Sequence, residues 1–204
     1  MRIHDVTRAM VAGMPVWPGD PPCRCGWYAR LPSDVANGAE LSFGAHTGTH
    51  VDGPLHVLED GAPIGRLPLD AFIGPAHVVD AGAAGEIAEE WLAENLPGGC
   101  ERLLLRTRAW RNAEFPEMWP ALAPAAARLL VARGVRLLGT DAPSPDPLES
   151  NDLPVHHVLL GAGIPIVENL LLDDVAPGAY ELIALPLRLA EADASPVRAV
   201  LLER

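Results

Sequence analysis

Proline and glycine interrupt this chain at short intervals, and they limit what it can fold into. The 204 residues include 21 prolines and 19 glycines, many of them in groups such as PGDPP, LPGG and DAPSPDP. Such groups mark turns and loops, because proline fixes φ and glycine admits backbone conformations that other residues avoid. Between them lies no apolar run of the roughly eighteen residues that a membrane-spanning helix needs. We therefore expect short elements joined by long loops.

The hydrophobic pattern changes near residue 76. Before it, runs 2–7 and 39–46 are strand-like, and the segment between them has no helical period. After it, strand-like and helix-like runs alternate. Strands are expected at 76–81, 100–107, 135–142, 163–169, 180–189 and 196–203, and helices at 86–96, at 122–134 and after Leu153. This order predicts one α/β domain over residues 1–204, with a central mixed sheet.

Charge and cysteine content exclude some classes of function. The chain has 27 acidic and 15 basic side chains, and its net charge of −12 repels phosphate backbones. We therefore expect no nucleic-acid partner, and the lack of a long apolar run predicts no membrane partner. The N-terminal segment MRIHDVTRAM lacks the pattern of a signal peptide, so the cytoplasm is the expected location.

The three cysteines do not predict a disulfide framework, because their number is odd and no signal peptide is visible. Cys23 and Cys25 form a CxC pair that could bind a soft metal. No second Cys/His pair lies at zinc-finger spacing. Partly buried thiols are the simpler interpretation, and the sequence assigns the pair no role.

The densest group of ligand-type side chains is HTGTHVDGPLH, from His46 to His56. Gly48 lets the backbone turn, so the imidazoles of His46 and His50 can converge without a helix. His50 and Asp52 point the same way if the chain is extended there. Imidazole with carboxylate suits zinc, manganese or iron, and two histidines with one aspartate leave positions open for water, as catalytic sites do. Ordinary polar residues at a turn are the alternative interpretation.

A second group lies in LPVHHVLLGAGIPIVENL. His156 and His157 face about 100° apart on a helix, so we expect only one of them to face a metal ion. Glu168 follows the apolar run IPIV, where a strand would present a carboxylate at its tip. A buried carboxylate needs a partner, which a cation would supply. A surface histidine pair and an ordinary strand-end glutamate would give the same pattern, so this group alone leaves both interpretations open.

Together these motifs resemble a known family. HTGTHVDGPLH fits every fixed position of the HxGTHxDxPxH signature of the cyclase-like metal-dependent hydrolases. The blocks WPGD, DAPSPDPLESNDLPVHHVLL, IVENL and YELIALPLRLAEADASPVRAVLLE, which extend from Trp17 to the end of the sequence, are similar to those of the bacterial kynurenine formamidases. The resemblance implies an α/β fold of the swivelling β/β/α type and assembly into homodimers or higher homo-oligomers.

The same resemblance implies a dinuclear zinc site. His46, His50 and Asp52 would hold one ion, with Asp52 bridging to the second. His156 and Glu168 would complete the pair, with Glu168 also shared. His156 is preferred over its neighbour because the family's ligands lie twelve residues apart, as His156 and Glu168 do. Manganese or iron would fit the same ligands.

The activity implied is that of an arylformamidase, which hydrolyses N-formyl-L-kynurenine to L-kynurenine and formate in tryptophan degradation. His56 would be the general acid/base that carries a proton from water to the leaving aryl amine. Trp17 would stack on the aromatic ring of the substrate, or it could be a structural aromatic in a proline-rich turn. Relatives that open isatin or other cyclic or N-acyl amides share the metal motif and are the first alternative. A non-catalytic metal-binding protein is the second.

Overall fold

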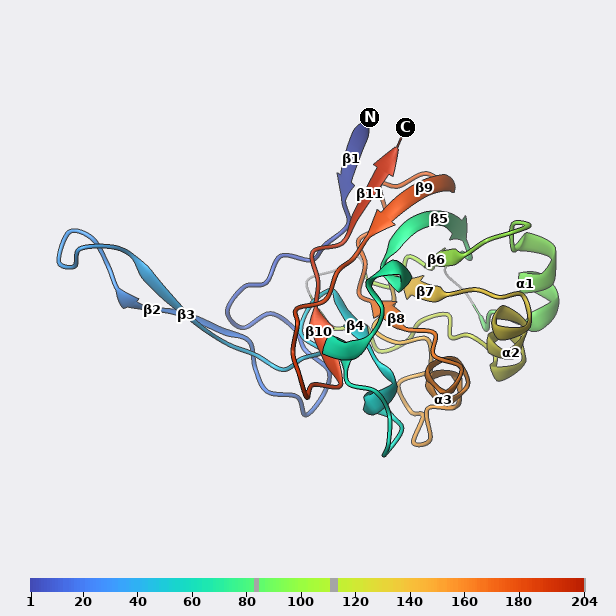
Figure 1. Cartoon of the computed structure of the whole chain (residues 1–204), viewed down its shortest axis with the longest axis horizontal. Helices are drawn as coiled ribbons and strands as arrows, with labels where there is room; N and C mark the ends of the chain where they lie inside the picture. Colours follow the sequence, from blue (N-terminus) through green and yellow to red (C-terminus); the bar gives the residue numbers. More distant parts are fainter. Residues whose placement is uncertain (83–84, 111–113, 204) are drawn as a thin grey trace.

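A nine-stranded mixed sheet dominates the computed structural model, which describes residues 1–82, 85–110 and 114–203. Its strand order is β1-β11-β9-β5-β6-β7-β8-β4-β10 (Figure 1). Neighbouring strands at its centre are parallel: β5 (Ile73–Asp80), β6 (Arg102–Arg106), β7 (Leu137–Thr140) and β8 (Ile166–Glu168). The other strands pair antiparallel: β1 (Arg2–Asp5), β4 (His50–Asp52), β9 (Gly178–Ile183), β10 (Ala194–Pro196) and β11 (Val200–Glu203). The predicted α/β fold with a central mixed sheet is confirmed.

Helices connect the parallel strands, since a parallel pair needs a crossover. They are α1 (Glu89–Asn95), α2 (Pro124–Ala132) and α3 (Pro154–Gly161). Proline occupies the first turn of α2 and of α3, where its missing N–H has no helical partner to lose. The helix predicted from residue 86 begins later, because Ile87 pairs with Leu122 in a bridge and its N–H bonds the carbonyl oxygen of Ala121 at 2.8 Å. Tertiary pairing therefore overrides the helical pattern at this end.

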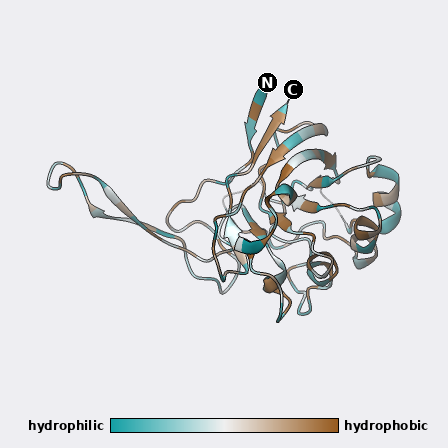
Figure 2. Ribbon diagram, in the orientation of Figure 1, coloured by the Kyte–Doolittle hydropathy of each residue, from teal (hydrophilic) through white to brown (hydrophobic). Residues whose placement is uncertain are grey.

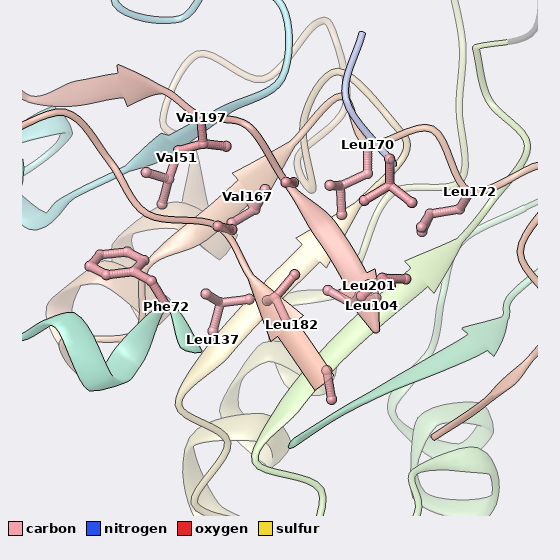
Figure 3. Packing of buried hydrophobic residues seen from close by; sticks show 14 of the residues in the cluster. Val51, Phe72, Leu104, Leu137, Val167, Leu170, Leu172, Leu182, Val197 and Leu201 are labelled. Carbon is pink, nitrogen blue, oxygen red and sulfur yellow. The ribbon is translucent and has the colours of Figure 1, made fainter. Parts of the chain in front are cut away.

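Strands β6, β7 and β8 are buried on both faces, as their apolar runs predict. Leu103 and Leu105 pack against the helices, whereas Leu104 between them faces the opposite side of the sheet. Figure 3 shows that opposite side, where side chains of β4, β6, β7, β8, β9 and β11 meet in one interior. The sheet curls around this second core, and Leu182 and Leu201 are fully buried in it.

The strands near the end of the sequence differ from those expected. The run 180–189 leaves the sheet at Ile183, the last residue of β9, and β10 was not anticipated. Short 3-10 turns at Ile64–Arg66 and Leu69–Ala71 lead into β5. None of the described helices is long and apolar enough to cross a membrane.

A hairpin arm, formed by β2 (Arg24–Ala29) and β3 (Gly38–Ser42), extends away from the rest of the molecule (Figure 1). The two strands form a sheet of their own, and Figure 2 shows hydrophobic and hydrophilic residues mixed along it. Its exposed apolar side chains are Trp27, Tyr28, Leu31, Val35 and Leu41. The arm therefore has no core of its own.

Candidate metal centre

Strands β4 and β8 bring the two predicted ligand groups together. They run antiparallel, and their register sets His50 directly opposite Glu168. Residues opposite one another project from the same face, and Asp52 shares that face with His50 because it lies two positions further along β4. Glu168 ends the parallel strand β8, and the crevice beyond the carboxyl ends of parallel strands is where α/β sheets usually bind ligands.

A tight turn before β4 presents His46. Gly48 has a φ of +68°, in the left-handed region that favours glycine. The side-chain amide of Asn169 donates to the carbonyl oxygen of Gly48 at 3.0 Å, and Nδ1 of His50 lies 2.9 Å from the same oxygen. A carbonyl oxygen only accepts, so Nδ1 of His50 carries the hydrogen and Nε2 is left to face the cluster.

Four side chains converge around Asp52. Nδ1 of His46 and Nε2 of His50 lie 2.9 and 3.4 Å from Oδ1 of Asp52. Nε2 of His156 lies 3.6 Å from the other oxygen, Oδ2. Glu168 is shared in the same manner, with one oxygen 3.2 Å from His50 and the other 3.3 Å from His156. The two oxygens of each carboxylate thus lie near different histidines, which is the arrangement that a bridging ligand requires.

The cluster fits a metal ion. In the part of the chain that the structure describes, four of its buried atoms have no hydrogen-bond partner: Nε2 of His50, both oxygens of Asp52 and Oε1 of Glu168. Burying such groups without partners is costly. These four atoms lie close to other polar atoms of the cluster but are not aligned for hydrogen bonds. They are oriented like ligands around a common centre. Imidazole and carboxylate donors suit zinc, manganese or iron.

The charge balance of the cluster leads to the same conclusion. Burial disfavours protonation of His46, but the carboxylates of Asp52 and Asp193 outweigh it and raise the pKa of His46 to about 11. In the same way, Asp52 and Glu168 overcome burial and raise the pKa of His50 to about 9. Burial would raise the pKa of Asp52, yet His50 and His46 hold it well below its usual range. Without a cation the histidines therefore carry protons, which a bound metal ion would displace.

Two carboxylates that sequence reasoning missed surround the cluster. Asp146 is fully buried and lies 2.7 Å from Nδ1 of His156, which orients that ring. Oδ2 of Asp193 lies 2.8 Å from Nε2 of His46 and 3.1 Å from Nδ1 of His56. Asp146 stands in the proline-rich loop after β7, and Asp193 directly before β10. Neither has a ligand-like spacing that could have revealed it.

His56 and Trp17 both line a cavity of about 400 Å³ beside the cluster. His56 ends the 3-10 turn Pro54–His56, and its ring centroid lies 4.4 Å from that of His46 and 5.5 Å from that of His156. Trp17 makes edge-to-face contacts with Phe115 and with a second tryptophan at centroid distances of 5.8 and 5.9 Å. The cavity therefore has an aromatic wall on one side and the histidine cluster on another.

Other residues singled out from the sequence lie outside the cluster. His157 is exposed on α3, while its neighbour His156 is buried. Cys23 is buried and Cys25 exposed at the base of the hairpin arm, and both thiols are free. Of this pair, only His156 lies in the cluster, and its role as a metal ligand stays a prediction.

The chain is similar to known proteins along nearly all of its length. A family model described as "Putative cyclase" matches residues 4–147. The chain is 45% identical to a kynurenine formamidase of Salinibacter ruber, over 98% of this chain and 97% of that relative. It is 42% identical to a kynurenine formamidase of Bacillus cereus, over 97% and 95% of the two chains.

Solved structures share the fold. A "Potential Metal-Dependent Hydrolase With Cyclase Activity" matches with a TM-score of 0.85 and 29% identity, over 100% of this chain and 99% of that chain. Isatin hydrolase A from Labrenzia aggregata, bound to benzyl benzoate, matches with a TM-score of 0.83 and 27% identity, over 98% and 93%. The architecture, the HTGTHVDGPLH signature and these matches agree, and the chain belongs to the cyclase family.

Proposed function

We propose that this protein is an arylformamidase that hydrolyses N-formyl-L-kynurenine to L-kynurenine and formate in tryptophan degradation. The main observation that supports the proposal is the buried cluster of histidines and carboxylates, which lies beside a cavity with an aromatic wall. The identity of 45% and 42% to two kynurenine formamidases, over nearly the whole of each chain, supports the choice of substrate. The hydrolysed bond is the linear amide between the formyl group and the aryl nitrogen.

For the cofactor we propose two zinc ions per subunit. His46, His50 and Asp52 would hold one ion, and His156 and Glu168 the other, with Asp52 and Glu168 shared. The contacts of both carboxylates with histidines on two sides support this arrangement. The unpartnered buried oxygens of Asp52 support it as well.

The mechanism follows from the residues that face the cavity. Bound zinc would lower the pKa of a coordinated water to about 7 and polarise the formyl carbonyl. Trp17 and the neighbouring aromatic side chains bind the aniline ring and orient the formyl group towards the cluster. Nε2 of His56 takes a proton from the attacking water and passes it to the aryl nitrogen as the C–N bond breaks. That transfer matters because an aryl amide anion is a poor leaving group.

Metal content and formate release, measured on the same purified sample, test the proposal. We expect His56→Ala to keep its zinc and to lose about 10²- to 10⁴-fold in kcat, the usual contribution of a general acid/base. His50→Ala should lose both zinc and turnover. His156→Ala and His157→Ala form a matched pair on one helix, and only the first should lose zinc. Turnover of His56→Ala at the parent rate would show that the acid/base is another group.

The alternative substrate is isatin, and the likeness to isatin hydrolase A is the observation that favours it. Parallel assays on N-formyl-L-kynurenine and isatin decide between them. A higher kcat/KM on isatin would replace the proposed substrate. Failure to release formate from any formanilide would instead favour a non-catalytic metal-binding protein.

We also propose that the protein is a homodimer, in which the hairpin arms of the two subunits form the interface. A two-stranded hairpin is marginally stable in water by itself. This arm nevertheless exposes Trp27, Tyr28 and Val35, with Val35 at 101% exposure. Arg24, Arg30, Asp34 and Glu40 cancel in charge on the arm, whereas the whole chain carries −12. The arm is thus where two acidic copies meet with least repulsion.

Light scattering coupled to gel filtration tests this assembly. Replacing residues 27–36 by a short turn should convert the dimer to a monomer, because it removes the exposed apolar surface. Replacing the exposed 3-10 residue Leu69 by serine is the control and should leave the dimer intact. A dimer that survives loss of the arm would contradict the proposal. A single domain over residues 1–204 and a cytoplasmic location stay predictions.

A further inference from the structure

Asp193 lies beside the pair of strands β4 and β10, which come from opposite ends of the sequence. It directly precedes β10, which pairs antiparallel with β4. Its carbonyl oxygen accepts the N–H of Gly53 at 2.8 Å, and the carbonyl oxygen of Ala192 accepts the N–H of Ile64 at 2.9 Å. These backbone bonds fix the point from which the Asp193 side chain departs, beside the strand that carries the candidate ligands.

One oxygen of Asp193 contacts two imidazoles. Oδ2 lies 2.8 Å from Nε2 of His46 and 3.1 Å from Nδ1 of His56. A carboxylate only accepts, so each of these ring nitrogens carries a hydrogen. His46 is left with Nδ1 facing Asp52, at 2.9 Å from Oδ1, and His56 is left with Nε2 as its free nitrogen. The contact thereby sets the tautomer of both rings.

The burial of this group strengthens its contacts. The side chains of His46, His56 and Asp193 are 22%, 25% and 37% exposed. Charges that are partly removed from water interact more strongly than an exposed pair.

We propose that Asp193 is a positioning residue that holds His56 for proton transfer. A carboxylate behind an imidazole fixes its orientation and stabilises the cation that forms when the ring takes a proton. In the reaction, the water oxygen bonds to the formyl carbon and one water proton moves to Nε2 of His56. That proton goes to the aryl nitrogen as the C–N bond breaks, which gives the aryl amine and formic acid, which ionises to formate. The inference rests on the proposed function, because it names the group that supports the acid/base.

The decisive variant is Asp193→Asn, which keeps the size of the side chain and removes its charge. On zinc-loaded enzyme we expect kcat for N-formyl-L-kynurenine to fall about 10- to 100-fold, as is usual when the partner of a site histidine is removed. KM should change less than about threefold, because substrate binding does not involve this carboxylate. Measured at saturating zinc, the zinc content should equal that of the parent, because a weaker affinity from the lost contact with His46 does not lower the occupancy there.

A leaving-group series separates positioning from a structural role. The substrates are formanilides whose anilines differ in basicity. The defect of Asp193→Asn should shrink as the aniline becomes a better leaving group, because less proton donation is then needed. A general loosening of the site would lower all the rates by one factor. Asp193→Glu, which keeps the charge, should recover part of the loss.

Coupling to His56 is the second test. The double variant His56→Ala with Asp193→Asn should be no slower than His56→Ala alone, because the carboxylate acts through the ring. Glu191→Gln removes an exposed carboxylate two residues earlier and is the matched control, expected to turn over at the parent rate.

Three results would overturn the proposal: an equal loss with every formanilide, additive effects in the double variant, or loss of zinc from Asp193→Asn. The last would assign Asp193 to support of His46 as a ligand. Failure of the proposed function is a different result, in which the parent enzyme hydrolyses isatin and not formylkynurenine. In that case, the rates of the Asp193 variants are compared on a series of substituted isatins.

Discussion

Removing the carboxylate of Asp146 should weaken both α3 and the candidate metal centre. Asp146 accepts hydrogen bonds from the backbone N–H groups of Val155 at 2.9 Å and His156 at 3.0 Å, and it lies 2.7 Å from Nδ1 of His156. The residue at the N-cap position, Leu153, supplies no side-chain cap and has a φ of +43°. Asp146 therefore caps this helix from the preceding loop and orients a proposed ligand with the same carboxylate.

The magnitude follows from the groups left behind. Asp146→Ala leaves two backbone N–H groups and one imidazole nitrogen buried without this acceptor. Each such loss costs about 1–3 kcal/mol. Because the three bonds share one carboxylate and water can enter the space it leaves, we expect a total of about 3–5 kcal/mol, in the lower half of the sum. At about 2–4 °C per kcal/mol for a chain of this size, Tm should fall by roughly 6–20 °C.

Thermal unfolding followed by circular dichroism measures this effect, on zinc-loaded and on EDTA-treated protein. The zinc affinity of Asp146→Ala should also fall by about 10- to 100-fold, because the ring of His156 loses the partner that orients it. Glu149→Gln alters an exposed carboxylate of the same loop and should stay within about 0.5 kcal/mol of the parent. If Asp146→Ala melts with the parent and binds zinc as tightly, the loop carboxylate supports neither the helix nor the ligand.

Three further predictions concern the turn, the charge balance and the cavity. Gly48→Ala places a side chain at a φ of +68°, which costs about 1–2 kcal/mol; a melt and a zinc titration should show lower stability and weaker binding, and an unchanged titration would contradict this. In metal-free protein the pKa values of His50 and His46, about 9 and about 11, lie above the ordinary 6.5, so their stabilising effect is complete below about pH 6.5 and is lost as pH rises through those values. Tm of the EDTA-treated protein should therefore fall between about pH 7 and about pH 10, and a flat profile would refute the charge balance. Asp20 lines the cavity outside the cluster, so Asp20→Asn should raise KM about tenfold, or about 1.4 kcal/mol, for formylkynurenine and not for a formanilide that lacks the α-ammonium group.

Local features of the site could be predicted from the sequence because their causes are local. Gly48 turns the chain before β4 as its place between two histidines suggests, and Pro154 begins α3. The apolar runs 100–107, 135–142 and 163–169 form parallel strands, as expected because such strands are covered on both faces and have nearly continuous apolar sequences. The roles of the individual ligands stay predictions, although the structure brings all of the named side chains together.

Features that depend on distant pairing could not be predicted. Asp193 reaches His46 across 147 residues because β10 pairs with β4, and no periodicity in the sequence reports that pairing. The start of α1 moves for a similar reason, since Ile87 pairs with Leu122 before the helix begins. In the hairpin arm, β3 overlaps the strand-like run 39–46, but β2 was missed because its residues do not alternate clearly among the neighbouring prolines and glycines.

The positions of β8 and β10 determine when the candidate metal centre can form during synthesis. β4 is synthesised early, but both of its neighbours in the sheet, β8 and β10, are made more than 100 residues later. At the usual rate of about 5–20 residues per second, a ribosome needs roughly 7–28 s to travel from Asp52 to Asp193. For most of that interval the nascent chain carries His46 and His50 without Glu168, and for all of it without Asp193. The complete cluster of histidines and carboxylates can therefore form only after nearly the whole chain has been synthesised.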